Sequence, residues 1–263
     1  MKLNEETIRS MAEDGERLDN RDLNEYREIK IETDYINETS EGSALVEIGD
    51  TKVLVGLSIE IEEPYDDRPG KGTIVTNAEL APMAKREYES GPPQEEGVEL
   101  ARVVDRGIRE AEAIDLEDLC MVEGEKVYTV FIDVHVLNDD GNLIDAASLA
   151  AMAALKSGYL PAYDEEAGEL NRDEKWKDIE LQCEPVTVTG RKIGDTLLWD
   201  TTGEEEEALD ARLTVSKKKD GNIVAMQKGG TQPYTAEEIS ETMSKADEKI
   251  EKLRNLLEDE VGE

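Results

Sequence analysis

The chain has 263 residues, of which 65 are acidic and 30 are basic, so its formal net charge is −35 at pH 7. No apolar run reaches the roughly 18 residues that a membrane-spanning helix needs, and alternating strand patterns exclude a disordered acidic protein. The acidic residues are spread along the whole chain, which predicts a halophilic source, because the Debye length falls to about 3 Å at 1 M salt.

The two cysteines predict a reducing compartment. Cys120 and Cys183 lie far apart in the sequence and form neither a CxxC motif nor a metal-binding spacing. The N-terminal stretch MKLNEETIRSMAEDGE lacks the apolar segment of a secretory signal. We therefore expect a cytoplasmic protein with free thiols and no membrane partner.

The first third of the chain predicts one short helix followed by three strands. A helix is expected at about 5–13, and EYREIKIETDYI alternates as a strand does. The segment 44–61 predicts two strands joined by Gly49-Asp50, a two-residue turn of the hairpin type. Residues 62–97 carry several proline and glycine residues and are expected to be irregular.

The middle of the chain predicts a helix, a strand and a second helix. The first helix is expected at 98–113 and the strand at 127–137, with its aliphatic side chains on one face. A turn at 139–141 then leads into a helix of small residues at 145–158, which ends at Gly158.

The last third predicts a second group of strands and a long helix. Residues 163–182 are polar and are expected to form a surface loop. The strands that follow are expected in PVTVTGRKI, DTLLWD, ARLTVSKK and NIVAMQKG. A C-terminal helix is expected at about 236–259, where Thr235 and Glu238 have capping-box spacing and Ile239 begins the apolar stripe. The order of elements predicts one α+β domain over 1–263, with mixed sheets and packed helices.

A cluster of arginines stands out in this acidic chain. In ELARVVDRGIRE (99–110), Arg102, Arg106 and Arg109 lie within about 60° of each other on a helix, opposite an apolar face. Composition alone favours a solvated face whose arginines pair with Asp105 or other carboxylates. The alternative is a site for a negatively charged partner.

Other candidates for chemistry are weaker. His135 is the only histidine, so no histidine cluster exists for zinc, and we expect a hydrogen-bonded side chain near the edge of the core. Asp139, Asp140 and Asp145 could form a magnesium site. The interpretation we favour is that Asp139 and Asp140 shape a turn and that Asp145 caps a helix. No metal site is predicted.

Several blocks of the chain together resemble the RNase PH family. They are RLDNRDLNEYREIKIE, EGSALVEIGDTKVLVG, TNAELAPMA, ELARVVDRGIREAEAIDL, VFIDVHVLNDDGNLIDAASLAAMAAL and RLTVSKKKDGNIVAMQKGG. The resemblance runs nearly end to end and weakens only over 163–182 and the last few residues. Within the family, the chain is most similar to the archaeal exosome ring subunits that lack a phosphorolytic site of their own.

This resemblance implies an RNase PH-like βαβα core with extra strands, and a six-membered ring in which two related subunits alternate as a trimer of heterodimers. The implied partners are a catalytic RNase PH-like subunit, RNA-binding cap subunits and single-stranded RNA. The catalytic subunit would degrade RNA from 3′ to 5′ with inorganic phosphate as acceptor. The chain itself would bind no cofactor.

The resemblance also assigns site residues. Active relatives hold phosphate with a Gly-Ser/Thr-Arg loop, which matches Gly141-Asn142-Leu143, so that Leu143 replaces the arginine. They also carry two aspartates six residues apart, which match Asp200 and Gly194, with Asp195 one residue away. No catalytic residue is therefore expected in this chain.

Arg102 and Arg106 match arginines that hold RNA phosphates beside the partner's active site, and Arg109 has a weaker match. Phosphate contacts of this kind position a strand without reading its sequence. Two alternatives stay open. In the first, the chain is itself an active phosphate-dependent 3′–5′ exoribonuclease, in which Asp195 or another carboxylate replaces the one missing at Gly194. In the second, it is an acidic protein-interaction module that does not bind RNA.

Overall fold

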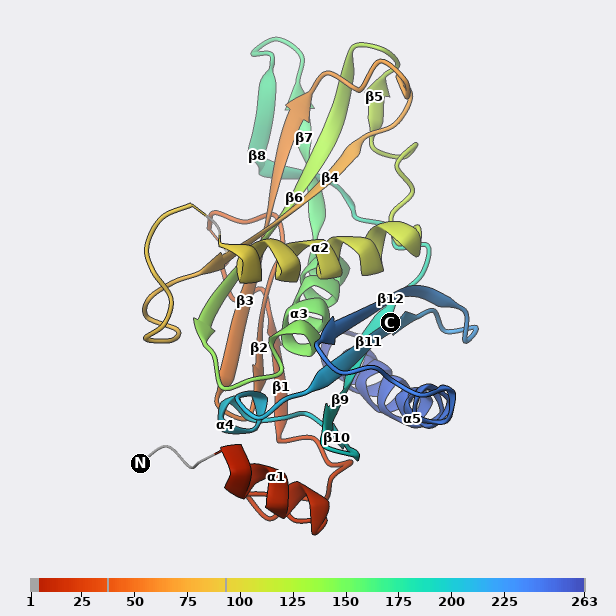
Figure 1. The fold of residues 1–263 in the computed structure, drawn as a ribbon. Coiled ribbons are helices and arrows are strands. Elements are labelled where there is room, and N and C mark those ends of the chain that lie inside the picture. The colour runs from red at the N-terminus through yellow and green to blue at the C-terminus, as the bar shows by residue number, and fades with distance from the viewer. Residues whose placement is uncertain (1–4, 37, 93, 263) are drawn as a thin grey trace.

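A computed structural model describes residues 5–36, 38–92 and 94–262. These residues form an α+β fold with two larger sheets, a separate two-stranded hairpin and five helices (Figure 1). The first sheet has the strand order β1-β2-β3-β6-β4, with β5 beside β6. Its strands are β1 (Ile29–Thr33), β2 (Ser43–Ile48), β3 (Thr51–Glu62), β4 (Thr73–Leu80), β5 (Cys120–Val122) and β6 (Lys126–Asn138).

The first sheet is antiparallel except where β4 runs parallel to β6. The predicted Gly49-Asp50 turn joins β2 and β3, which confirms the hairpin. The predicted strand at 127–137 is β6, and its aliphatic side chains are buried as expected, whereas His135 on the other face is exposed. The alternation of this strand therefore identified the face that packs on the core.

Two predictions of irregular structure were wrong. Residues 73–80 form β4, an edge strand that buries Ile74 and Ala78 but presents polar side chains elsewhere. Residues 159–178 form the hairpin β7 (Tyr159–Asp164) and β8 (Glu169–Asp178). Most side chains of β8 are exposed, so the segment lacks the apolar alternation that marks a strand in a sequence.

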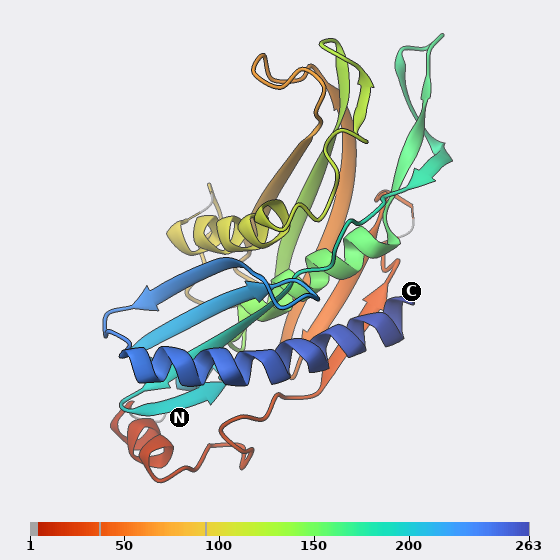
Figure 2. The ribbon, with the colours of Figure 1, turned by 90° about the vertical axis from the view of Figure 1, so that its right-hand side faces the viewer.

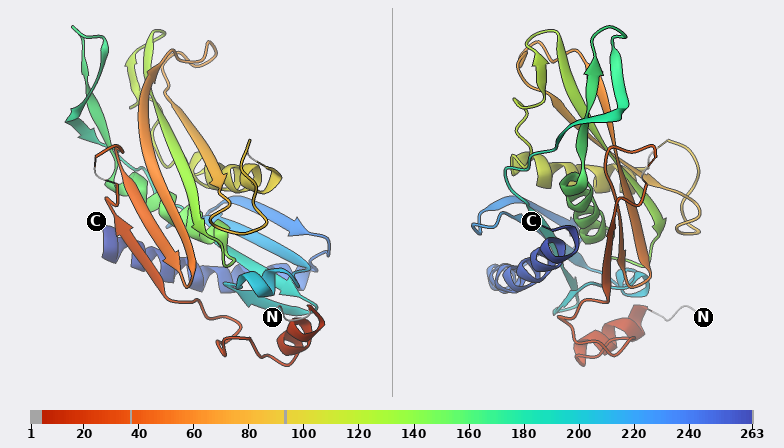
Figure 3. Two further views of the ribbon diagram at one scale, coloured as in Figure 1. Left: turned by 90° about the vertical axis from the view of Figure 1, so that its left-hand side faces the viewer. Right: turned by 180° about the vertical axis from the view of Figure 1, so that it is seen from behind.

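The second sheet is antiparallel, with the order β10-β9-β11-β12. Its strands are β9 (Val186–Ile193), β10 (Thr196–Trp199), β11 (Ala211–Lys217) and β12 (Ile223–Gly230). Every residue of β9 is buried, because α3 (Leu143–Ser157) and α5 (Ala236–Val261) both pack on it. Figures 2 and 3 show α5 along the face of this sheet that is turned away from α2 (Glu95–Glu110).

The helix α3 lies between the two sheets. It contacts β2, β3 and β9, and nearly all of its residues are buried. Its alanines allow both sheets to approach closely, as the small-residue pattern of the sequence predicted. One hydrophobic core consequently includes residues of both sheets and of α2, α3 and α5.

The two terminal helices confirm the predictions made for them, with one exception. α1 (Glu5–Glu13) packs by Ile8 and Ala12 against a second, smaller core near β10 and α4 (Gly203–Glu206). α5 begins with the predicted capping box, in which the Glu238 N–H donates to Thr235 Oγ1 at 3.1 Å and the Thr235 N–H donates to Glu238 Oε2 at 2.7 Å. Ile239, predicted in the apolar stripe, is instead exposed.

Candidate nucleic-acid interface

The arginine stretch lies on α2, which begins at Glu95, three residues before the predicted start at 98. The predicted apolar face is buried against β4, α3 and the second sheet. A Cβ on Gly107 would lie 3.3 Å from Ser216 Oγ and 3.4 Å from Thr187 Oγ1, so glycine lets the helix come close to β9 and β11. Burial of this face leaves the arginine face turned away from the core.

Two of the three arginines have no partner in the described part of the chain. Arg102 is exposed and Arg106 is half-buried, and neither makes a hydrogen bond or ion pair with another described residue. Arg106 lines a small hollow above the second sheet with Val103, Met226 and Gln227. Both guanidinium groups can therefore bind a phosphate without first breaking an ion pair.

Arg109 is engaged within its own subunit. Its Nε donates to Asp105 Oδ2 at 3.0 Å, and its Nη2 donates to Asp105 Oδ1 and to the carbonyl oxygen of Ile74, both at 2.7 Å. The hydrogen bonds that Arg109 donates to Asp105 raise the pKa of Arg109, and burial, which lowers it, has a smaller effect. This side chain fastens α2 to β4, and an approaching phosphate would compete with a carboxylate for it.

A cavity of about 190 Å3 opens beside the N-terminal half of α2. Leu143, the first residue of α3, lines it with an apolar side chain, at the position where the family resemblance implied the loss of a phosphate-binding arginine. Each of the three cations in its wall is paired with a carboxylate of the same chain, in the pairs Lys85–Asp139 (3.0 Å), Arg191–Glu206 (3.1 Å) and Arg212–Glu99 (2.5 Å).

Sequence reasoning missed these charged residues. The available signal was the pair Arg191-Lys192 inside the otherwise uncharged strand VTVTGRKI, all of which is buried. A charged side chain in such a strand needs a counter-ion, and the partner of Arg191 comes from α4, a helix of four residues that the sequence did not reveal. Burial would lower the pKa of Arg191, but Glu206 and Asp145 raise it above its ordinary value.

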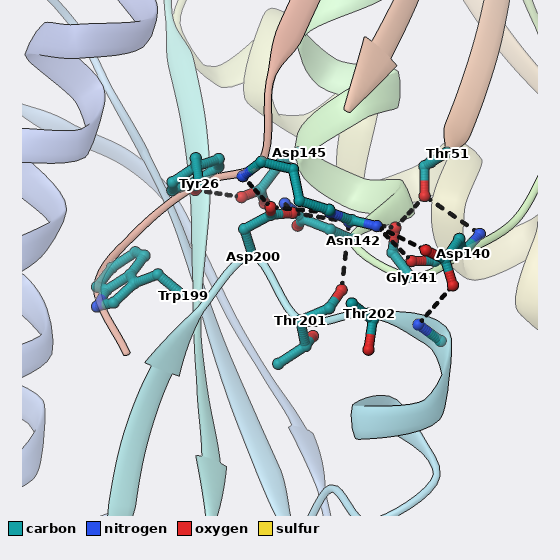
Figure 4. A network of polar contacts seen from close by, with 12 residues as sticks. Tyr26, Thr51, Asp140, Gly141, Asn142, Asp145, Trp199, Asp200, Thr201 and Thr202 are labelled. Carbon is teal, nitrogen blue, oxygen red and sulfur yellow. Dashed lines mark hydrogen bonds and ion pairs between the residues drawn. The ribbon is translucent and has the colours of Figure 1, made fainter. Parts of the chain in front are cut away.

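Asp200 is buried within a network of polar contacts (Figure 4). Arg27 donates to it from its backbone N–H at 2.7 Å, from Nε at 2.9 Å and from Nη2 at 2.8 Å. Arg21 Nη1 and Asn142 Nδ2 donate to it at 3.0 and 2.7 Å. Burial by itself would raise the pKa of Asp200, but Arg27 and Arg21 outweigh it and hold the pKa below the usual range.

Two carboxylates, Asp195 and Glu206, lie on either side of Asp200 in the sequence, and of these two only Glu206 lines the cavity. Gly194 lies in the turn between β9 and β10, next to Asp195, which is exposed at the far end of β10 from Asp200. Glu206, in contrast, follows Asp200 by six residues and lines the same cavity as Leu143. Asp200 and Glu206 thus also lie six residues apart, with the second carboxylate on the C-terminal side of Asp200 instead of the N-terminal side.

The prediction that Asp145 caps α3 was wrong. The N-cap residue is Asn142, with a left-handed backbone at φ 60°. Asp145 is fully buried, where it accepts a hydrogen bond from the Tyr26 hydroxyl at 2.6 Å (Figure 4). It also accepts one from the backbone N–H of Thr189 at 3.2 Å. Its desolvation raises its pKa. The turn predicted just before the helix is confirmed, since the Gly141 N–H donates to Asp139 Oδ1 at 2.9 Å.

The remaining candidates do not form a site. His135 is not at the core edge but exposed on β6, with Nδ1 3.3 Å from Glu79 Oε2. Cys120 and Cys183 are free and half-buried. Over residues 5–36, 38–92 and 94–262, no group of three metal-ligating side chains gathers. No helix in that part of the chain is long and apolar enough to span a bilayer.

The chain is similar to known proteins over most of its length. The chain is 44% identical over 257 residues to exosome complex component Rrp42 of Thermococcus gammatolerans, covering 97% of this chain and 94% of that protein. It is 47% identical over 253 residues to exosome complex component Rrp42 of Methanocella arvoryzae, covering 95% and 94%. A chain of the Archaeoglobus fulgidus exosome, solved with RNA bound to the active site, superposes with a TM-score of 0.89 at 44% identity and covers 95% of this chain and 96% of that one.

Two family models match the sequence in order. Residues 25–161 match domain 1 of the 3′ exoribonuclease family and residues 183–249 match domain 2. The RNase PH-like α+β fold expected from the sequence is thereby confirmed. The chain belongs to the 3′ exoribonuclease, or RNase PH, family.

Proposed function

We propose that this chain is a non-catalytic, RNA-binding subunit of an archaeal exosome ring in the cytoplasm. Its partner in the ring is a catalytic RNase PH-like subunit, with which it forms a trimer of heterodimers that carries RNA-binding cap subunits. Inorganic phosphate is used at the partner's site, and this chain binds no cofactor. Exosome components of comparable length and 44–47% identity support the assignment to the complex.

The non-catalytic role rests chiefly on Leu143. Phosphorolysis needs cationic groups around the attacking phosphate, but Leu143 lines the cavity with an apolar side chain. The cations nearby are already paired with carboxylates, and Asp200 is held by Arg27 and Arg21. A carboxylate with a lowered pKa and several donors is a poor source of a proton for a leaving group.

RNA binding is assigned to the exposed face of α2. Arg102 and Arg106 are four residues apart on this face and make no ion pair with other described residues. Guanidinium groups bind phosphate oxygens in pairs and are more weakly hydrated than ammonium groups. Arg109 contributes less to RNA binding, because it already forms an ion pair with Asp105.

The decisive experiment mixes the purified chain with the catalytic subunit in molar salt, measures the mass of the complex, and assays RNA with and without phosphate. We expect no turnover by the isolated chain and phosphate-dependent degradation by the complex. The double variant R102E/R106E should assemble normally but retain RNA poorly. A matched control is K30E/K252E, which changes the charge equally on β1 and α5, away from α2. Unchanged RNA retention by R102E/R106E would support a protein-interaction module instead.

One observation favours the alternative of an active phosphate-dependent exoribonuclease. Two carboxylates, Asp200 and Glu206, lie six residues apart, and Glu206 lines the cavity. Phosphate-dependent turnover by the isolated chain would establish this alternative. Unchanged activity of the assembled complex carrying D200A would exclude it, provided that the variant is folded.

A further inference from the structure

The carboxylate of Glu206 is held by three donors at the rim of the cavity. Its Oε1 accepts the backbone N–H of Asn142 at 2.9 Å, Arg191 Nε at 3.1 Å and Thr201 Oγ1 at 3.2 Å. Asn142, Arg191 and Thr201 are each at most 1% exposed, whereas the Glu206 side chain is 30% exposed. A side chain on the outside of the fold therefore reaches inward to buried donors.

These donors form a set that suits an oxyanion. A backbone N–H, a guanidinium and a hydroxyl directed at one oxygen are the groups that hold phosphate and sulfate in proteins. The guanidinium of Arg191 cannot lose its proton, so its burial requires an anion close by. In this chain Glu206 supplies that anion within hydrogen-bonding distance.

Glu206 is not needed to stabilise its own helix, α4. The N-terminus of α4 is capped by Thr202 and Glu205, whose side chains satisfy each other's backbone N–H groups. Glu205 also forms the buried ion pair with Arg17, at 2.6 Å. The α4 segment is thus anchored without Glu206, which leaves the contact with Asn142, Arg191 and Thr201 as the structural role of this side chain.

We propose that Glu206 is a built-in anion that fills an oxyanion site of this subunit and keeps inorganic phosphate out of the cavity. The other two cations of the cavity are neutralised in the same way, Lys85 by Asp139 and Arg212 by Glu99. The cavity therefore keeps the donors for an anion but offers no net positive charge to a free one. This inference deepens the proposed non-catalytic role and rests on it.

The test compares the wild-type chain with E206A, E206S and the control E204A, which removes an exposed carboxylate from the same helix. Thermal unfolding is followed in about 2 M KCl while inorganic phosphate replaces chloride at constant ionic strength. For E206A we expect a saturable rise of the unfolding temperature by a few degrees. The wild type and E204A should show no such rise, which separates binding at this site from the general effect of phosphate on protein stability.

A folded E206A that does not respond to phosphate would overturn the proposal, and so would a wild type that responds equally. If E206A fails to fold, E206S carries the same test, because it removes the charge opposite Arg191 and leaves the oxyanion site open. A phosphate response of E206S supports the proposal and its absence refutes it. Neither result depends on Arg102 or Arg106, so RNA retention by the assembled ring still tests the proposed function separately.

Discussion

Arg27 binds Asp200 through its backbone N–H, Nε and Nη2, with all three hydrogen bonds between 2.7 and 2.9 Å. The same guanidinium donates to the backbone and side chain of Asp140 just before α3, at 2.8 and 3.0 Å. Asp200 also accepts from Asn142 at the start of α3. Asp200 thus joins the N-terminal segment, the end of β10 and the beginning of α3.

Asp200→Asn should destabilise the protein by about 3 kcal/mol at pH 7, because Arg27 and Arg21 would lose a buried counter-ion. The folded pKa of Asp200 lies below the value of about 3.9 in an unfolded chain. Its carboxylate therefore stabilises the fold above about pH 4, and this contribution is lost as pH falls through the folded pKa. Urea unfolding from pH 2 to 7 should show a weaker acid dependence for D200N than for wild type.

The matched control for this prediction is Asp195→Asn, on the same hairpin but exposed. It should leave both the stability and its acid dependence within about 0.5 kcal/mol of wild type. Equal effects of D195N and D200N would contradict a special role for the Arg27–Asp200 contact.

Gly141→Ala should be much more destabilising than Gly124→Ala. Both glycines have a left-handed backbone, with φ of 80° and 77°. A Cβ on Gly141 would lie 2.5 Å from the carbonyl oxygen of Thr201, whereas a Cβ on Gly124 would meet nothing within 4 Å. We expect about 1 kcal/mol of backbone strain in G124A and about 2 kcal/mol more in G141A, measured by chemical denaturation. Similar losses in the two variants would refute the close approach at Gly141.

The three arginines of α2 should differ in function, with Arg102 and Arg106 affecting RNA binding and Arg109 affecting stability. In the assembled ring without phosphate, R102A and R106A should each weaken RNA binding and reduce the dependence of log K on log salt by about 0.7. R109A should change that slope little and instead lower the stability of the subunit by about 0.5 kcal/mol, since it removes the pair with Asp105. A salt titration of RNA affinity together with urea unfolding distinguishes these outcomes. The opposite pattern, with R109A carrying the larger change in slope, would show that Asp105 yields Arg109 to RNA.

Leu143→Arg should not by itself create a phosphorolytic enzyme. The new guanidinium would stand in the cavity wall, but Asp200 would remain held by Arg27, and Glu206 would remain bound to Arg191. We expect no phosphate-dependent RNA degradation by isolated L143R, and L143M serves as the control for changes in packing. Turnover by L143R alone would show that this one side chain separates the subunit from an active enzyme.

The charge of −35 predicts a requirement for salt. At about 0.1 M KCl the Debye length is about 10 Å, so carboxylates on the surface repel one another, and at 1 M it is about 3 Å. We expect the free energy of unfolding to rise on the order of 2 kcal/mol between these concentrations. The same titration in NaCl tests whether screening or a particular cation is responsible. Stability that is constant over this range would contradict adaptation to high salt.

Much of the fold could be predicted from local pattern. The Gly49-Asp50 hairpin, the apolar face of β6, the small-residue helix α3 and the capping box at Thr235 each depend on residues that are close together in the chain. The strands β4 and β8 were not predicted, because β4 lies at a sheet edge and β8 lies in an exposed hairpin. Their backbone groups are satisfied by pairing with another strand, while few of their side chains are buried.

The sequence by itself determined the arginine face of α2, the absence of a charged side chain at Leu143 and the acidic composition, because these follow from residue identity and helical spacing. Only the tertiary structure decided which charges are free. Arg102 and Arg106 stay without an ion pair among the described residues, whereas Arg109, Asp200 and Glu206 are bound by specific partners. Asp200 meets Arg27 across 173 residues of sequence and Glu206 meets Arg191 across 15. A counter-ion is selected by proximity in space, which no local pattern encodes.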